Sequence, residues 1–218
     1  MKVFFSTIIF FIAVLSLNAK DKIHWSEGKI ILEDNSEVSG VVSYNYKHGV
    51  VLHKNEDGIT KAFSAAQVSY FEYFDELMQV PRRYIALPFN TDKNYKNEVF
   101  FELIMDGEIA VFRKEKKNIN LEFIRQHDNE NFTRYHASFD YYFFKEGSFM
   151  LLKDFTKNLL PTIKSEFPSQ IDAFIEENGL NVENGIHAIL VIDYYNALQD
   201  ATYNNVQVAQ SFNLEENH

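Results

Sequence analysis

Residues 28–75, GKIILEDNSEVSGVVSYNYKHGVVLHKNEDGITKAFSAAQVSYFEYFD, decide the fold of the N-terminal half of the chain. Short runs rich in Val, Ile, Tyr and Phe are separated here by turn residues. Val42, Tyr44 and Tyr46 alternate with polar residues, which is the period of a half-buried strand. The pattern predicts five strands: Lys29–Glu33, Glu37–Tyr46, Val50–Lys54, Ile59–Phe63 and Val68–Phe74. This spacing favours a small SH3-like or Sm-like β-barrel, in which curling hides the strand edges.

The chain after Pro81 is predicted to form further antiparallel hairpins. The expected strands are Tyr84–Leu87, Val99–Met105, Glu108–Arg113, Ala137–Lys145 and Ser148–Lys153. Asp106-Gly107 is typical of a two-residue type I′ turn, because this turn needs positive backbone φ angles. The boundary region 79–83 contains one Pro and no Gly, unlike a flexible tether. The two halves are therefore expected to form one packed unit.

Apolar residues at helical spacing predict that helices close the chain. Pro161 is expected to kink or split the first helix, Pro168 to begin the second and Gly179 to end it. A third helix is expected over Glu183–Leu198. Residues 200–218 are polar and aperiodic, which predicts a disordered tail.

The sequence therefore predicts an α+β protein with four segments. These are a signal peptide over 1–19, a small β-barrel-like domain over 20–80, β-hairpins plus C-terminal helices over 81–199, and the tail over 200–218.

The first 19 residues, MKVFFSTIIFFIAVLSLNA, have the features of an export signal. Lys2 supplies the positive charge, and small Ala19 suits the cleavage site. The apolar stretch Val3–Leu17 is shorter than the roughly 20 residues that a membrane-spanning helix needs. We expect cleavage before Lys20 and a soluble periplasmic or secreted protein with no membrane span after cleavage.

Composition excludes several classes of function. The 218 residues include 21 Phe and 12 Tyr, which is far too aromatic for a mostly disordered chain. The chain has no Cys, which excludes disulfides, thiolate metal sites and cysteine nucleophiles. The net charge of −10, from 21 basic and 31 acidic residues, argues against nucleic acid and anionic membranes as partners.

The polar side chains form no recognised catalytic or cofactor motif, since the serine-hydrolase elbow and both glycine-rich phosphate loops are absent. His127, Asp128, Glu130 and His136 could ligate a metal, but their spacing matches no zinc motif. A solvated polar loop is the favoured interpretation. No catalytic, cofactor-binding or metal residue is therefore assigned, and no cofactor is expected.

Other isolated polar residues are expected to face solvent. His48 and His53 are predicted on opposite sides of the surface, because an odd separation along a strand changes the face. Glu102 and Asp140 interrupt apolar strands, and alternation predicts that they lie on the solvent side. Lys114–Lys117 is expected to be a solvated hairpin end rather than a site for an anionic polymer.

Two aromatic clusters occupy both faces of their predicted strands. The first consists of Tyr70, Phe71, Tyr73 and Phe74, and the second of Phe139, Tyr141, Tyr142, Phe143 and Phe144. Such strands are buried on both sides or present one aromatic face for binding. Packing between layers is the favoured interpretation.

Three stretches resemble a group of uncharacterised exported proteins of Bacteroidota. They are Ile31–Tyr73 with the pattern L-x-D-N-x-x-x-x-G, Phe100–Phe112 around its Asp-Gly turn, and the helical end Phe155–Asn196. The resemblance implies export and a barrel-first architecture. It supplies no catalytic or ligand-binding residue.

The leading functional hypothesis is a non-enzymatic, exported envelope protein that binds a partner protein or a small ligand. The alternative is a hydrolase that acts on an envelope polymer through a pair of carboxylates. A purely structural accessory protein is a third possibility.

Overall fold

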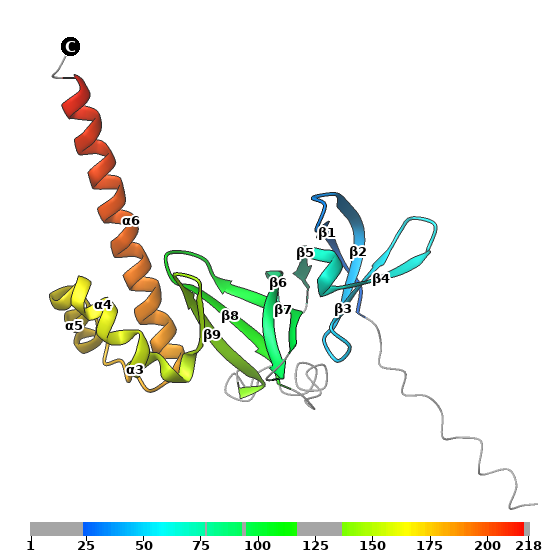
Figure 1. The fold of residues 1–218 in the computed structure, drawn as a ribbon, viewed down its shortest axis with the longest axis horizontal. Coiled ribbons are helices and arrows are strands. Elements are labelled where there is room, and N and C mark those ends of the chain that lie inside the picture. Colours follow the sequence, from blue (N-terminus) through cyan, green and yellow to red (C-terminus); the bar gives the residue numbers. More distant parts are fainter. Residues whose placement is uncertain (1–23, 77, 93–94, 117–136, 216–218) are drawn as a thin grey trace, which may run out of the picture.

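The computed structural model of the chain describes residues 24–76, 78–92, 95–116 and 137–215. Within them, an antiparallel sheet of ten strands is followed by C-terminal helices, so the α+β class is confirmed (Figure 1). The strands are β1 (Ser26–Leu32), β2 (Glu37–Asn45), β3 (Val50–Lys54), β4 (Thr60–Ser64), β5 (Val68–Asp75), β6 (Val80–Asp92), β7 (Tyr95–Met105), β8 (Ala110–Glu115), β9 (Phe139–Lys145) and β10 (Ser148–Leu151). The helices are η2 (Ala65–Gln67), η3 (Leu152–Asp154), α3 (Phe155–Asn158), α4 (Leu160–Glu166), α5 (Pro168–Glu177) and α6 (Gly185–Glu215). None of the described helices is both long enough and apolar enough to cross a membrane.

The sheet is open, with the order β10-β9-β8-β7-β6-β5-β1-β2-β3-β4. The expected SH3-like or Sm-like barrel is therefore not confirmed, because β4 and β10 remain as outer strands. The domain boundary expected near Pro81 falls inside β6, which pairs with β5 and with β7. β6 is longer than predicted. It continues through Pro88 because its pairing with β5 ends at Ile85, so Pro88 is paired only with β7 and needs no N–H donor on its other side.

Two apolar cores form on opposite faces of this sheet. The first fills the inner face of the N-terminal half and contains Ile30, Val42, Val51, Ala65, Val68, Phe71, Tyr84 and Phe100. The second lies on the other face of β6–β10 and contains Phe101, Ala110, Phe112 and Tyr142, with Phe89 and Phe149 packed against them. The adjacent residues Phe100 and Phe101 are therefore both buried, each in a different core.

Ring contacts show that the two halves curl toward opposite faces. The rings of Tyr44 in β2 and Phe100 in β7 lie 5.8 Å apart, and those of Phe89 in β6 and Phe149 in β10 lie 6.1 Å apart. Each pair is separated by four strand spacings, which would be about 19 Å in a flat sheet. Strong curvature in both halves brings these rings into contact.

A third core joins the sheet to the helices. It consists of Ile109, Val111, Phe143, Leu152, Phe155, Leu159, Ile163, Ile171, Ala188, Val191, Ile192 and Tyr195. The predicted break at Pro161 is present, because α3 ends at Asn158 and α4 begins at Leu160. Pro168 begins α5, and Gly179 follows its end with a positive φ of 58°. Both expectations are confirmed, since Pro fits a first helical turn and Gly tolerates left-handed backbone.

The last helix corrects the expectation of a disordered tail. Helix α6 continues through residues 200–215, and Figure 1 shows its C-terminal part projecting from the body of the protein. The physical reason is the absence of both Gly and Pro after residue 199, so nothing in this stretch stops a helix.

The hairpin at Asp106-Gly107 is present, but its predicted turn type is wrong. The connection between β7 and β8 spans residues 106–109, and Gly107 has a φ of 145°, far from a type I′ turn. Ile109 in this connection has no strand partner among the described residues, and the side chain of Asn196 in α6 bonds to its backbone instead. The Asn196 side chain accepts a hydrogen bond from the Ile109 N–H and donates one to the Ile109 carbonyl, both at 3.0 Å.

We predict that Asn196→Ala lowers the free energy of unfolding by about 2–4 kcal/mol. The change leaves the N–H and carbonyl of fully buried Ile109 without these partners, and an unpaired buried polar group costs roughly 1–3 kcal/mol. Urea unfolding measures the loss. Asp193→Ala, at an exposed position of the same helix, should cost less than about 0.5 kcal/mol. Equal effects of the two substitutions would contradict this role for Asn196.

Candidate functional site

A groove of about 1340 Å³ crosses the N-terminal half of the sheet. It is lined by residues of β1, β2, β5 and β6, by the β3–β4 loop and by Leu103 of β7. Its residues Lys29 and Glu72 are the sequence neighbours of the core residues Ile30 and Phe71. Because successive side chains of a strand point to opposite faces, the groove lies on the outer face, behind the first core.

One row of side chains crosses the groove floor from strand to strand. Ser39, Lys29, Glu72, Arg83 and Leu103 lie directly opposite one another on β2, β1, β5, β6 and β7. The Lys29 Nζ lies 3.1 Å from Glu72 Oε1, and the Arg83 Nη2 lies 2.8 Å from Glu72 Oε2. We call Lys29, Glu72 and Arg83 the charge ladder.

The charge ladder holds Glu72 in its ionised form. Partial burial alone would raise the pKa of Glu72, but hydrogen bonds from Lys29 and Arg83 and their positive charges outweigh it. The net effect is a pKa below the ordinary value. At neutral pH Glu72 is therefore an anion matched by two cations.

A second row follows along the strands. Lys54, Val41 and Glu27 lie opposite one another on β3, β2 and β1, and Phe74 of β5 lies opposite Pro81 of β6. The Lys54 Nζ sits 4.7 Å from the ring centre of Trp25, the single tryptophan of the chain. Phe74 is 45% exposed, which is unusual for a large aromatic side chain.

The β3–β4 loop forms one end of the groove with the exposed acids Glu56 and Asp57. Its shape is set by Asn55, whose side-chain oxygen Oδ1 accepts a hydrogen bond from the Ile59 N–H at 2.8 Å. The Asn55 amide also donates to Asp57 Oδ2 at 3.3 Å. Glu56, Asp57 and Glu27 of β1 have no ion-pair partner among the described residues.

A network of buried charges lies on the opposite face of β5–β8. Glu102 accepts hydrogen bonds from Arg113 Nε at 2.7 Å, Arg113 Nη2 at 2.9 Å and Arg82 Nη1 at 2.6 Å. Arg82 Nε in turn donates to Asp75 Oδ2 at 2.5 Å. All four residues are buried, so we call them the buried network. Its two acids and two arginines balance, as buried charges must.

The buried network overturns the expectation that Glu102 faces solvent. Alternation predicted exposure, but β7 is covered on both faces, by Phe100 and the network on one side and by Phe101 on the other. Asp140 does face solvent as expected, with its side chain 48% exposed and 4.0 Å from Lys116. The two carboxylates do not form a catalytic pair, since Glu102 is already bound by two guanidinium groups.

The pKa of Glu115 in β8 lies well above that of an ordinary carboxyl group. Burial raises its pKa from 4.5 to about 7, and the negative charge of Glu102 adds to the shift. The nearby Arg113 opposes it only in part. Glu115 therefore keeps its proton to a higher pH than an ordinary carboxyl group does.

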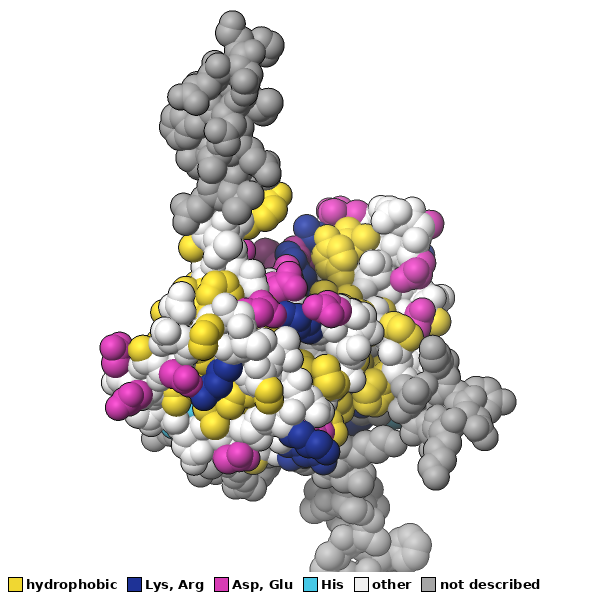
Figure 2. All heavy atoms as spheres, turned by 60° about the vertical axis from the view of Figure 1, so that its left-hand side comes forward, with side chains coloured by type: hydrophobic (Ala, Val, Ile, Leu, Met, Phe, Trp, Pro, Cys, Tyr) yellow, Lys and Arg dark blue, Asp and Glu magenta, His cyan; other side chains and the backbone are white. Residues whose placement is uncertain are grey.

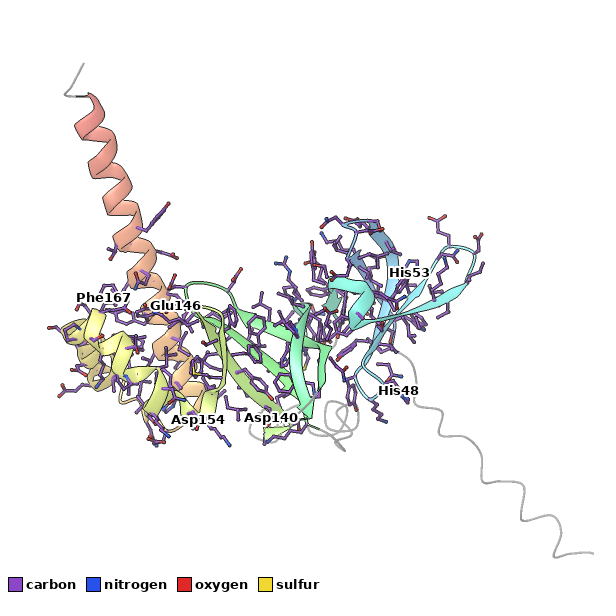
Figure 3. The ribbon with its side chains drawn as sticks, in the orientation of Figure 1. His48, His53, Asp140, Glu146, Asp154 and Phe167 are labelled. Atoms are coloured by element: carbon purple, nitrogen blue, oxygen red, sulfur yellow. The ribbon has the colours of Figure 1, made fainter. Side chains whose placement is uncertain are left out.

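Of the two histidines expected at the surface, His48 is exposed and His53 is buried. His48 is exposed in the β2–β3 turn, as expected. His53 is 6% exposed, and its Nε2 lies 3.1 Å from the Ser39 carbonyl oxygen, so the surface expectation is wrong. His53 lies opposite the core residue Val42 of β2, so it faces the inner side of the sheet, whereas His48 lies in the turn before β3 (both labelled in Figure 3).

The candidate metal ligands His127, Asp128, Glu130 and His136 lie outside the described residues. Among the described residues, no group of three His, Asp or Glu side chains is placed to hold a metal ion. Of the Lys114–Lys117 stretch, Lys116 donates to the Ala137 carbonyl at 2.9 Å, and Lys117 is also outside the described part.

The aromatic clusters mostly pack between layers, as favoured from the sequence. Phe71 and Phe143 are fully buried, and Tyr142 is 8% exposed. Phe74 and Phe144 depart from this pattern, because both remain more than a third exposed. Sequence reasoning missed the groove because its floor depends on which residues of separate strands lie opposite one another. The clustered aromatic residues around Phe74 were the one signal in the sequence.

A second polar cluster ties the helices to the sheet. The Lys145 Nζ donates to the Tyr195 hydroxyl at 2.9 Å, and that hydroxyl donates to Glu166 Oε2 at 2.6 Å. Gln199 donates to the same Glu166 oxygen at 2.6 Å. Figure 2 shows acidic side chains close to basic ones on the face that carries the helices, with no patch of one sign. These hydrogen bonds join Lys145 of β9, Glu166 of α4 and Tyr195 and Gln199 of α6.

We predict that Arg113→Met destabilises the fold by about 3–5 kcal/mol. The substitution removes both hydrogen bonds that Arg113 donates to the buried Glu102 carboxylate. Removing one partner of a buried ion pair typically costs about 3–5 kcal/mol, because the other charge stays buried. The matched control is Arg83→Met in the charge ladder, where Arg83 is 51% exposed. The control should cost no more than about 1 kcal/mol. Similar losses in urea unfolding would refute the distinction between the two arginines.

We predict that Glu115 makes the protein less stable as the pH rises. Between pH 4.5 and about 7 the folded chain retains a proton on Glu115 that the unfolded chain has released, so this stability contribution falls across that interval. Glu115→Gln removes the loss. The stability of the variant relative to the natural protein should rise from pH 4.5 to 7 and then level off in urea unfolding. A stability difference that stays flat across this pH interval would contradict the raised pKa.

Comparison of the chain with protein-family models, with curated proteins and with solved structures finds no match. Function is therefore inferred from the geometry of the groove.

Proposed function

We propose that the protein is an exported, soluble envelope protein that binds a partner through the groove and has no enzymatic activity. The observation that carries the proposal is the groove itself, a concavity of about 1340 Å³ with paired charges along its floor. Phe74 adds an exposed aromatic surface to the groove lining. Aromatic side chains beside ordered polar groups are typical of binding sites for proteins.

The arrangement of carboxylates favours binding over the alternative, hydrolysis of an envelope polymer. A hydrolase of that kind needs one acid that carries a proton near neutral pH and a second that is free to act as base or nucleophile. In the groove, Glu72 is ionised and held by Lys29 and Arg83. Glu115 has a suitable pKa, but it is not among the residues that line the groove.

The N-terminal half supports a classification as an open SH3-like barrel. Its strands follow the order β5-β1-β2-β3-β4, and the short helix η2 precedes β5. Small barrels of this kind commonly serve as binding modules. Lys2, the apolar stretch and Ala19 support export, as does the resemblance to exported proteins of Bacteroidota.

Site-specific crosslinking in the native host tests the proposal. A photoreactive amino acid replaces Ser39, an exposed residue in the middle of the groove floor. We expect a discrete adduct in the envelope fraction, carried by a chain that begins at Lys20. Adding Phe74→Ser should abolish the adduct, because it removes the exposed ring from the groove lining.

The matched control places the same photoreactive group at Ser148, an exposed residue of β10 outside the groove. Adducts of equal yield at both positions, or none at Ser39, would contradict binding through the groove. A chain that begins at Met1 in the membrane fraction would contradict export with cleavage.

A further inference from the structure

We infer that the groove takes an extended, positively charged segment of a partner protein, about seven residues long, with an apolar side chain that packs on Phe74. This inference rests on the proposed binding function and specifies the chemistry of the partner. It follows from the length of the groove, the balance of its charges and the position of its apolar residues.

The length follows from the strand order. The lining runs from the β3–β4 loop across β2, β1, β5 and β6 to Leu103 of β7. Five strand spacings correspond to about 24 Å. An extended chain advances roughly 3.3–3.6 Å per residue, so about seven residues span the groove.

Each basic side chain of the groove already contacts a side chain of this protein. Lys29 and Arg83 both pair with Glu72, and Lys54 lies over the Trp25 ring. Arg82, which also lines the groove, pairs with Asp75 and Glu102 of the buried network. An anionic ligand would therefore have to displace a carboxylate or a ring that these cations already contact.

The unmatched charges are negative. Glu27, Glu56 and Asp57 are exposed, and none has an ion-pair partner among the described residues. Glu56 and Asp57 lie in the β3–β4 loop, at the end of the groove opposite Leu103, and Glu27 lies on β1, the strand next to β5. Lysine or arginine side chains of a partner would complement them, and the net charge of −10 would speed the approach of a cationic segment.

The apolar residues Phe74, Pro81 and Leu103 of the groove lining supply an anchor for the partner segment. Phe74 is 45% exposed and lies opposite the exposed Pro81, and Leu103 ends the row of the charge ladder nearby. Covering a large ring of this kind is favourable, at about 25 cal/mol for each Å² of apolar surface. A segment that carries only charges would leave this surface exposed to water.

Trp25 provides the readout, because it is the single tryptophan and contacts Lys54 of the groove. The probe is a capped seven-residue peptide that alternates Lys and Leu, titrated against the mature chain while Trp25 fluorescence is followed. We expect saturable binding that weakens as the salt concentration rises. A twin with Glu in place of Lys should not bind, and a twin with Ser in place of Leu should bind at least about tenfold more weakly.

Charge reversal tests where the peptide binds. The double variant Glu56→Lys/Asp57→Lys should lower the affinity for the Lys-Leu peptide at least about tenfold. The matched control is Glu176→Lys/Glu177→Lys, which makes the same change in net charge at exposed positions of α5. The control should change the affinity less than about twofold. Phe74→Ser should lower the affinity for the Lys-Leu peptide but not the affinity for the Lys-Ser peptide.

Three outcomes would overturn the inference. Equal losses in both double variants would show attraction to bulk charge alone. If the protein prefers the Glu-Leu peptide and Phe74→Ser abolishes that binding, the groove is still the binding site but the partner segment is negatively charged. If no peptide binds saturably while the Ser39 adduct still forms, the inference of a cationic segment is wrong but binding through the groove stands. If the Ser39 adduct is also lost, the proposed function itself is wrong.

Discussion

The structure depends on two long strands that are buried on both faces. β6 and β7 lie in the middle of the sheet, and the neighbouring residues Phe100 and Phe101 each enter a different apolar core. No single layer covers both faces of such a pair. The N-terminal strands therefore curl over one face, and β8–β10 curl over the other, while the helices cover the face of β8 and β9 that this second curl leaves open.

Burial on both faces also explains the position of the charges. Polar residues on β6 and β7 cannot reach water where two cores meet, so Arg82 and Glu102 must find partners within the protein. Arg113 and Asp75 supply them from the strands on either side. One residue further along β6, Arg83 faces the groove and pairs with half-buried Glu72. Adjacent arginines thus have different roles, one in the interior and one at the candidate binding surface.

Local patterns predicted the elements well because each depends on neighbouring residues. The ten predicted strands correspond to those observed, and Pro161, Pro168 and Gly179 mark helix ends as expected. The errors concern properties that distant residues determine. Glu102 and His53 were expected at the surface because alternation indicates that a strand has two faces but not whether the second face is covered. The turn at Gly107 was mistaken because Asn196, far along the chain, bonds to it.

The groove could not be read from the sequence for the same reason. Lys29, Glu72 and Arg83 become neighbours only through the registers of β1, β5 and β6. Nothing in the spacing of these residues along the chain indicates that they meet. The exposed acids of the β3–β4 loop looked like ordinary turn residues until the loop was placed at one end of this row.

The contact between Asn196 and Ile109 determines when folding can be completed. The two residues are 87 positions apart, and the apolar face of β8 and β9 is covered by helices that follow these strands in the chain. Contacts between such distant residues form late, since the intervening chain must first be brought together. During synthesis, Val111 and Phe143 therefore stay exposed to solvent until α6 has emerged. The core between β8, β9 and the helices therefore closes only when Ala188, Val191 and Ile192 of α6 pack onto it.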